Sequence, residues 1–184
     1  MKFPRAILLA LLLAAIVGSL AHAQERRPSF SSAKAPDCVA TMGALPKPFD
    51  GVAFAVTGDT LAIVGLKPHV RLWGIQAPEL RDKNKQETVP GMRARAALDD
   101  LLTPADHKIH CNPDKWDRDC RIVALCVAKT TDIGGRMIDN GMAYGFDLDD
   151  VGKADVPLSL SYAESEAAAR KETRGLWPEW LGRK

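Results

Sequence analysis

The alternation of apolar and polar positions along the central part of the chain predicts a β-rich domain. Three short runs of apolar and β-branched residues, bounded by turn residues, are typical of strands: 51–56, 61–64 and 70–75. Because successive side chains of a strand point to opposite faces, Val70 and Leu72 are expected on one face of the third strand. Arg71 is then expected on the other face, together with Trp73.

Apolar residues at helical spacing predict three helices after these strands. The first is expected over 92–102, where alanine and leucine recur on one face and Pro104 follows the end. The second is a short helix over 137–142, and the third covers 159–174. Gly175 provides a natural stop for the third helix, because glycine adopts the left-handed conformation that commonly ends helices.

Two further apolar runs predict a β-hairpin between the first and second helices. They cover 107–111 and 121–128, and the polar segment 112–120 is expected to join them. Three strands, a hairpin and three helices together predict an α+β fold that is rich in β structure. A small five-stranded barrel with helices attached accommodates this order of elements.

The N-terminal segment has the pattern of a signal peptide. Lys2 and Arg5 precede an almost unbroken apolar run over 7–20, and the small residues of 21–23 fit a cleavage site. Cleavage there would make Gln24 the first residue of the mature protein. The expected location is therefore periplasmic or secreted, with no stable membrane insertion after cleavage. An uncleaved signal anchor is the alternative.

The remaining chain is long enough for one domain with its own core. We expect a signal peptide over 1–23, a disordered or extended leader over 24–48, and a single domain over 49–180. The whole chain carries 25 Lys and Arg against 23 Asp and Glu, a formal net charge of +2. Cleavage would remove two of the cations and leave the mature chain neutral. Any attraction to phosphate must then be local, because the chain lacks the basic surplus usual in nucleic-acid binders.

Four cysteines follow the predicted cleavage site: Cys38, Cys111, Cys120 and Cys126. An even number in an exported protein favours disulfides, although zinc is a competing interpretation that the absence of a CxxC pair disfavours. Cys111 and Cys126 lie at the ends of two strand-like runs, so a bridge across the hairpin is preferred. Cys38–Cys120 would then follow by elimination, and a tight Cys111–Cys120 loop is the main rival.

The segment from Arg71 to Glu79 combines a cation and a carboxylate across the end of a predicted strand. A guanidinium suits phosphate because its planar fork donates two parallel hydrogen bonds. A nearby carboxylate can hold a hard metal ion or take a proton from water. This pair suggests phosphodiester chemistry, and the segment begins a few residues after the Gly58-Asp59-Thr60 turn.

The order of these motifs resembles the thermonuclease (staphylococcal-nuclease-like) family. Five segments carry the resemblance: Gly58 to Thr60, Arg71 to Glu79, Asp117 to Ala124, Asn140 to Ala143, and Tyr162 to Glu164 continuing to Gly175–Trp177. The match spans roughly Gly51 to Trp177, nearly the whole mature domain, and the shared order of the segments is more specific than any single one. The resemblance implies an oligonucleotide-binding (OB) barrel that hydrolyses DNA and RNA with calcium, leaving 3′-phosphorylated products.

The resemblance also implies a role for each site residue. Arg71 and Arg121 match the two catalytic arginines, which would bind the scissile phosphate and oppose the charge that develops on it. Glu79 matches the glutamate that orients or deprotonates the attacking water. The implied calcium ligands are Asp59, Gln76, the carbonyl of Ala77, and Glu79.

Two departures from the family pattern weaken these implications. Gln76 stands where a second calcium aspartate is usual, so the metal site loses a formal charge. Asp119 places a negative charge near the expected path of the nucleic acid. We therefore expect an exported, calcium-assisted nuclease that acts on DNA, RNA or both as a monomer. The alternative is a catalytically weakened OB-fold binding or structural protein of the cell envelope.

Overall fold

A computed structural model of the chain describes residues 38–148 and 156–182. The predicted signal peptide and residues 24–37 of the predicted leader lie outside the described residues. The described part of that leader contains a short helix, α1 (Cys38–Met42), which the prediction of a disordered or extended segment did not include. Among the described residues, no helix combines the length and the apolar character needed to cross a bilayer.

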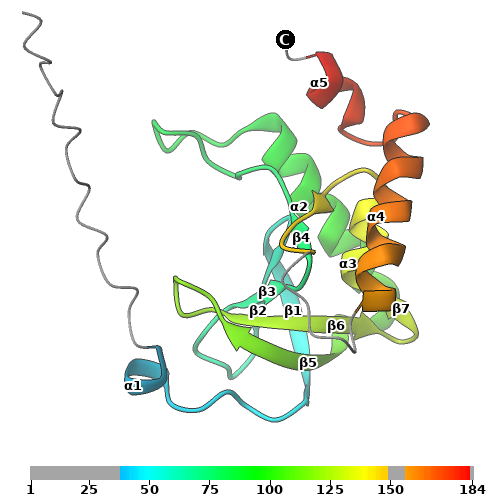
Figure 1. The fold of residues 1–184 in the computed structure, drawn as a ribbon. Helices are drawn as coiled ribbons and strands as arrows, with labels where there is room; N and C mark the ends of the chain where they lie inside the picture. The colour runs from blue at the N-terminus through cyan, green and yellow to red at the C-terminus, as the bar shows by residue number, and fades with distance from the viewer. Residues whose placement is uncertain (1–37, 149–155, 183–184) are drawn as a thin grey trace, which may run out of the picture. The chain divides into compact units, whose positions relative to one another are not determined.

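Five strands form a closed barrel: β1 (Phe49–Thr57), β2 (Thr60–Ile63), β3 (Val70–Leu72), β5 (Lys108–Trp116) and β6 (Ile122–Ala128). Hydrogen-bonded neighbours follow the order β3-β2-β1-β5-β6, and a parallel pairing of β3 with β6 closes the ring (Figure 1). The short strand β7 (Thr131–Asp132) continues the sheet beyond β6. The predicted α+β fold, β-rich and built on a five-stranded OB-type barrel, is confirmed.

The barrel closes where apolar residues of β3 and β6 face each other. Val70 pairs with Ile122 and Leu72 with Ala124, and all four side chains are buried. The larger side chains of Val70, Leu72 and Ile122 each contribute roughly 1.5–3 kcal/mol when they are fully removed from water. The alternation predicted for Val70 and Leu72 therefore decides where the ring closes.

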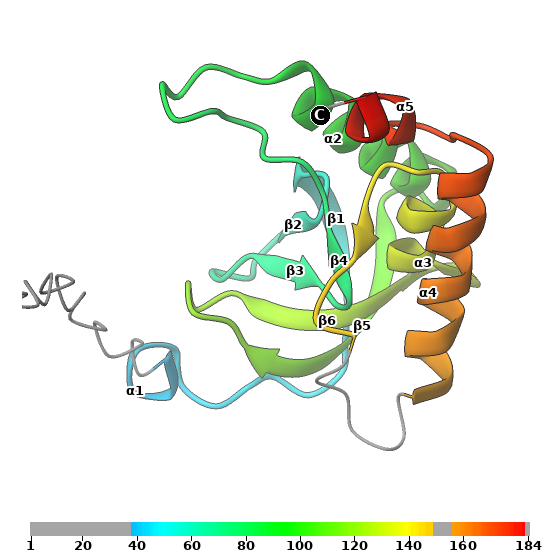
Figure 2. The same ribbon diagram turned by 45° about the horizontal axis from the view of Figure 1, so that its top comes forward.

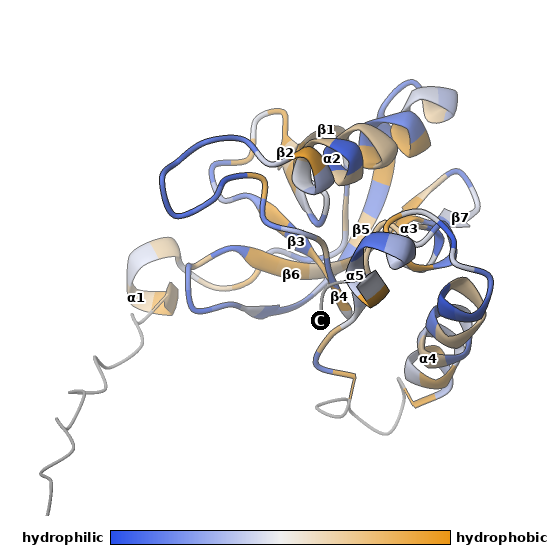
Figure 3. Cartoon of the chain, turned by 90° about the horizontal axis from the view of Figure 1, so that it is seen from above, coloured by the Kyte–Doolittle hydropathy of each residue, from blue (hydrophilic) through white to orange (hydrophobic). Residues whose placement is uncertain are grey.

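Five helices accompany the barrel in the described residues, two more than the three predicted. Besides α1 they are α2 (Val89–Leu102), α3 (Ile133–Asp139), α4 (Val156–Lys171) and α5 (Trp177–Gly182), and a 3-10 turn over Thr103–Ala105 follows α2. Figure 2 shows α2 to α5 gathered on one side of the barrel, with α1 near the opposite end of the strands. Strand β6 is largely hydrophobic, and the connection that leads into α2 is largely hydrophilic (Figure 3).

Side-chain caps explain where two of the helices begin. The hydroxyl of Thr88 accepts the N–H of Gly91 at the start of α2. The carboxylate of Asp132 accepts the N–H of Gly134 at the start of α3. Such caps satisfy amide groups that have no partner inside the helix and stabilise it by about 1 kcal/mol each.

The third predicted strand is wrong in its second half. The strand ends at Leu72, and the chain turns through Gly74, whose φ of 71° lies in the left-handed region. A new two-residue strand, β4 (Ile75–Gln76), then pairs with β8 (Tyr144–Gly145) outside the barrel. Trp73 is consequently buried rather than sharing the half-exposed face of Arg71.

The predicted hairpin is present, but its strands are longer than expected. β5 continues to Trp116, so residues 112–116 belong to the strand and only 117–121 connect it to β6. The helix predicted over 137–142 instead covers Ile133–Asp139, because the chain turns at Gly141 with a φ of 68°. The last long helix begins and ends three residues earlier than predicted.

Both preferred disulfides are confirmed. Cys111 and Cys126 face each other across the β5–β6 ladder and are bonded, and Cys38 is bonded to Cys120. The second bridge joins residues 82 positions apart and fixes α1 to the β5–β6 connection. No cysteine among the described residues is free, so the zinc interpretation and the rival Cys111–Cys120 pairing are both excluded.

Candidate functional site

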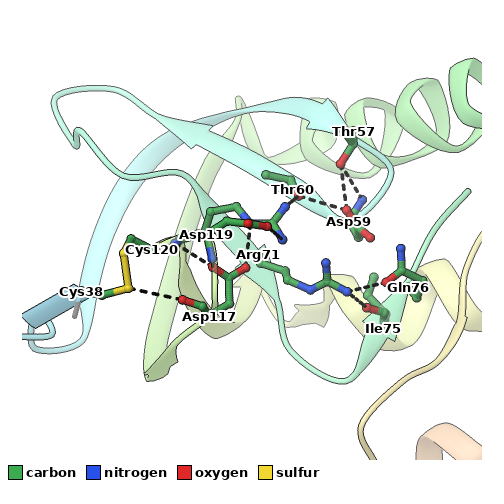
Figure 4. A network of polar contacts seen from close by, with 11 residues as sticks. Cys38, Thr57, Asp59, Thr60, Arg71, Ile75, Gln76, Asp117, Asp119 and Cys120 are labelled. Carbon is green, nitrogen blue, oxygen red and sulfur yellow. Dashed lines mark hydrogen bonds and ion pairs between the residues drawn. A yellow bond between two sulfur atoms is a disulfide. The ribbon is translucent and has the colours of Figure 1, made fainter. Parts of the chain in front are cut away.

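Arg71 lies at the middle of β3, paired with Thr60 of β2 and Val123 of β6. Its Nη2 donates a hydrogen bond of 2.6 Å to Oε1 of Gln76 and a longer one of 3.4 Å to the carbonyl of Ile75 (Figure 4). The guanidinium also lies over the ring of Phe146, 5.3 Å from its centroid. These contacts hold the half-buried cation in one orientation without neutralising it, because none of the partners is charged.

Arg121 ends the β5–β6 connection and lies one residue before β6 begins. Its Nε donates to Oδ2 of Asp117 at 2.7 Å, and its main-chain N–H donates to Oδ1 of the same residue at 2.9 Å. Asp119 adds a weaker ion pair at 3.4 Å. Nη1 of Arg121 also approaches the hydroxyl of Thr60 at 3.4 Å, which brings this side chain towards β2.

The two arginines line the same pocket, which has a volume of about 520 Å³. Lys115 and Arg118 add two further cations to its wall, against the carboxylates of Asp117 and Asp147. The pocket therefore carries an excess of positive charge although the mature chain is predicted to be neutral. An anion is favoured here because the low-dielectric walls of a cleft strengthen the local field.

Glu79 does not line the pocket of the arginines. Its side chain is exposed and borders a neighbouring hollow of about 650 Å³ together with Ala77, Tyr144 and Trp180. Its position is set by α2, because the hydroxyl of Thr88 donates to the Glu79 carbonyl at 2.6 Å. Gln76 lines both hollows and forms the boundary between them. The structure thus brings together Arg71 and Arg121, two of the three predicted catalytic residues. It places the third, Glu79, in the hollow on the other side of Gln76.

Asp59 lies in the turn between β1 and β2 and is only 6% exposed. One carboxylate oxygen accepts the hydroxyls of Thr57 and Thr60 at 2.8 and 3.0 Å. The other accepts the main-chain N–H of Ala77 at 3.1 Å. Three donors therefore hold both oxygens, and the carboxylate ties the turn to the segment that follows β4.

The oxygen atoms predicted to bind calcium do not suit that ion. Oε1 of Gln76 accepts the cationic Arg71, and Nε2 of Gln76 donates to the Ala77 carbonyl at 3.1 Å. Of the two carboxylates in the set, that of Asp59 accepts the Ala77 N–H, and that of Glu79 is exposed in the hollow that Ala77 also lines. Calcium prefers six to eight oxygen ligands, several of them carboxylates. Within the described residues, no three His, Cys, Asp or Glu side chains come together as a metal cluster.

Comparison with known sequences decides the family. The sequence profile described as staphylococcal nuclease homologue matches residues 69–179, more than half of the chain. The chain belongs to the staphylococcal nuclease homologue family. The resemblance on which the predicted roles rest is therefore confirmed, and the family is one of nucleases that generally depend on calcium.

A sequence relative of this chain is also named as an endonuclease. The chain is 28% identical over 121 residues to a protein named probable endonuclease LCL3 from Coccidioides posadasii. The aligned region covers 62% of this chain and 38% of that protein. The chain therefore spans well under half the length of this relative, and the similarity concerns one region of it.

The family match contains most of the predicted site, from Arg71 through Glu79 to Arg121, whereas Asp59 precedes it. The structure adds one residue that the sequence patterns did not single out, because Phe146 lies beneath Arg71. The only sequence signal for Phe146 is its place two residues after Tyr144. Asp117 opens one of the segments that carry the family resemblance, and the structure shows that it holds Arg121.

Proposed function

We propose that this domain binds single strands of DNA or RNA and hydrolyses their phosphodiester bonds. The observation that carries the proposal is the convergence of Arg71 and Arg121 on one cationic pocket. Each guanidinium can donate paired hydrogen bonds to phosphate oxygens. Membership of a nuclease family supports the same substrate class.

The proposed reaction adds water to phosphorus and breaks the bond from phosphorus to the 5′ oxygen. The leaving oxygen takes a proton, and the second product keeps the phosphate at its 3′ end. Arg71 and Arg121 oppose the negative charge that grows on the phosphate oxygens as the new bond forms. The family role of Glu79 is to orient the water or take its proton. For Glu79 to act, the scissile phosphate must lie at the boundary that Gln76 forms between the two hollows.

The family implies calcium assistance, but the donor atoms of this chain do not suit the ion. None of the steps of the proposed reaction requires calcium. The positive charge in the pocket comes from the arginines themselves.

One observation favours a second function, nucleic-acid binding without hydrolysis. Glu79 lies outside the arginine pocket, and Asp119 places a carboxylate beside Arg121. A protein with these features can hold a phosphate and still lack a group that activates water. The two functions share a ligand and differ only in whether bonds are broken.

A cleavage assay separates the two functions. Protein lacking residues 1–23 is incubated with denatured DNA or with RNA, in calcium and in EGTA, and the fragments are separated on a gel. The control is a variant with Arg71→Ala and Arg121→Ala together. Fragments produced by the wild type and lost in the control support hydrolysis. Binding without fragments in any buffer would establish the second function instead.

We also propose that the protein acts as an exported monomer, in the periplasm or outside the cell. Two disulfides support an oxidising compartment, and the proposed site is built from a single chain. Cell fractionation followed by light scattering of the purified protein tests both points. Recovery in the cytoplasm with reduced thiols would contradict the export proposal.

A further inference from the structure

The hydrogen bond between Arg71 and Gln76 lies where the family pattern would place a metal ligand. A neutral amide oxygen orients the guanidinium at 2.6 Å and leaves its positive charge in place. An aspartate at position 76 would instead neutralise Arg71, unless a divalent ion were present to compensate. Glutamine in place of the family's aspartate therefore makes the pocket more positive and removes one charged metal ligand.

The hydrogen bond between Arg71 and Gln76 disfavours the binding of a calcium ion beside these two residues. The ion would lie next to a guanidinium that already uses the Gln76 oxygen, and the carboxylate that contacts Ala77 is that of Asp59. That carboxylate is buried and accepts three hydrogen bonds, so a metal would have to replace donors that fix the turn. Repulsion between like charges and loss of these bonds both oppose the ion.

We propose that the pocket binds the phosphodiester backbone without calcium, with Arg71 and Arg121 supplying the positive charge that a metal ion would otherwise provide. Gln76 and Phe146 orient Arg71, and Asp117 orients Arg121. Asp59 then serves the fold, by tying the β1–β2 turn to Ala77. This inference rests on the proposed function for its substrate, and it goes further by removing the metal.

The test measures binding separately from cleavage. A fluorescent single-stranded oligonucleotide with phosphorothioate linkages, which resist hydrolysis, is titrated with protein in EGTA and in millimolar calcium at matched ionic strength. Because the matched ionic strength removes the strong salt dependence of phosphate binding, we expect dissociation constants that agree within about twofold. Binding that is absent in EGTA, or about tenfold tighter in calcium, overturns the proposal.

A calorimetric titration with calcium alone provides a second measurement. The wild type is expected to show no saturable heat. Saturable binding that disappears in Asp59→Asn would show that the carboxylate does bind metal, and would overturn the proposal.

The neutrality of Gln76 is tested by Gln76→Asp, with Gln86→Asp as the matched control. Both changes add one negative charge, but Gln86 is exposed on the connection between β4 and α2. In EGTA, Gln76→Asp should weaken oligonucleotide binding about tenfold, because its carboxylate would pair with Arg71, and Gln86→Asp should change it far less. Equal effects of the two changes, or none, would overturn the role assigned to Gln76.

The outcomes separate this inference from the proposed function. Tight binding in EGTA without cleavage of ordinary DNA in either buffer would refute the nuclease and leave the metal-free phosphate site standing. Cleavage that requires calcium, together with calcium-dependent binding, would support the nuclease and refute the metal-free site.

Discussion

Asp117 binds Arg121 at two points, through the main-chain N–H at 2.9 Å and through Nε at 2.7 Å. The first bond shapes the β5–β6 connection, and the second fixes the direction of the guanidinium. The contacts of Nη1 and Nη2 are both 3.4 Å and therefore weak. Asp117 thus leaves the two terminal nitrogens of Arg121 available for a phosphate in the pocket.

Asp117→Asn is predicted to lower the rate of hydrolysis by about 10- to 100-fold, because a misdirected group near the reacting centre has effects of this order. The amide keeps one oxygen for the main-chain N–H groups of the turn. Its NH₂ group cannot accept a hydrogen bond from Nε, so the Arg121 guanidinium loses the contact that orients it. Steady-state rates on denatured DNA measure the effect, and urea denaturation shows whether the fold survives. A wild-type rate in a folded variant would contradict the positioning role.

Asp119→Asn is predicted to act in the opposite direction. Its carboxylate is 58% exposed and lies 3.4 Å from Arg121, so it opposes an incoming phosphate. Removing this charge should tighten oligonucleotide binding about three- to tenfold at low salt, and the gain should fade as salt screens the site. Asp100→Asn, an equal change of charge at an exposed position of α2, is the control. Tightening of the same size in the control would mean that only net charge matters.

The barrel could be predicted because its strands carry their own pattern, whereas the break after Leu72 could not. Trp73 and Ile75 continue an apolar run, and nothing local requires a turn at Gly74. The turn is fixed by tertiary contacts: β4 pairs with β8, and Trp73 packs against Tyr162 with ring centroids 5.6 Å apart. The polarity of residues 112–116 likewise predicts a loop, whereas pairing with the buried strand β6 extends β5 through them.

The candidate site also depends on both local patterns and contacts between distant segments. The pattern of its own strand indicates Arg71, but the proximity of Arg71 to Arg121 depends on the parallel pairing of Arg71 with Val123. That register joins segments about fifty residues apart and has no local signal. The place of Glu79 follows from the break at Gly74 and from the anchoring of its carbonyl at α2, both of which arise only in the folded chain.

Arg71→Ala and Arg121→Ala are each predicted to lower hydrolysis by about 10²- to 10³-fold, as expected when one donor to a developing charge is lost. Binding should weaken as well, since the proposed site has both side chains in contact with the phosphate in the ground state. Rates and dissociation constants are measured on the same single-stranded substrate. Wild-type turnover in both variants would contradict the assignment of Arg71 and Arg121 to the active site.

Glu79→Ala tests whether the exposed glutamate takes part in the reaction. If it activates water at the boundary formed by Gln76, the rate should fall by about 10²- to 10⁴-fold with little change in binding. Glu87→Ala provides the control, because Glu87 is an exposed glutamate farther along the same connection. Equal rates for both variants would place the general base elsewhere.

Loss of the Cys38–Cys120 bridge is predicted to affect both stability and binding. In a Cys38→Ala, Cys120→Ala variant the free energy of unfolding should fall by about 2–5 kcal/mol, the usual range for a native disulfide. Oligonucleotide binding should also weaken, because Cys120 directly precedes Arg121 and the bridge fixes that connection. The corresponding double variant of Cys111 and Cys126 lies within the β5–β6 ladder and should lose stability with a smaller effect on binding. Equal binding losses, after correction for the unfolded fraction, would argue against a positioning role for the first bridge.

Tyr162→Phe is predicted to destabilise the attachment of α4 to the barrel. The Tyr162 side chain is only 2% exposed, and its hydroxyl donates to both carboxylate oxygens of Asp132 at 3.0 and 2.8 Å. Asp132 also caps α3, so loss of the hydroxyl removes a donor from a carboxylate that begins another helix. Removing one partner of such a bond costs about 1–3 kcal/mol.

The pH dependence gives this prediction a second test. Burial, and then the charge and hydrogen bond of Asp132, raise the pKa of Tyr162 well above its ordinary value. A tyrosine in the unfolded chain ionises with a pKa of about 10, so the contribution of the folded pair is complete below that pH and declines above it. Urea denaturation of wild type and variant should therefore give a constant difference from neutral pH to about 10 and a smaller one beyond. Tyr144→Phe, at the partly exposed second tyrosine, should change stability by less than about 0.5 kcal/mol throughout. A Tyr162→Phe loss no larger than this control, or one that grows above pH 10, would show that the Tyr162–Asp132 bond does not hold α4 in place.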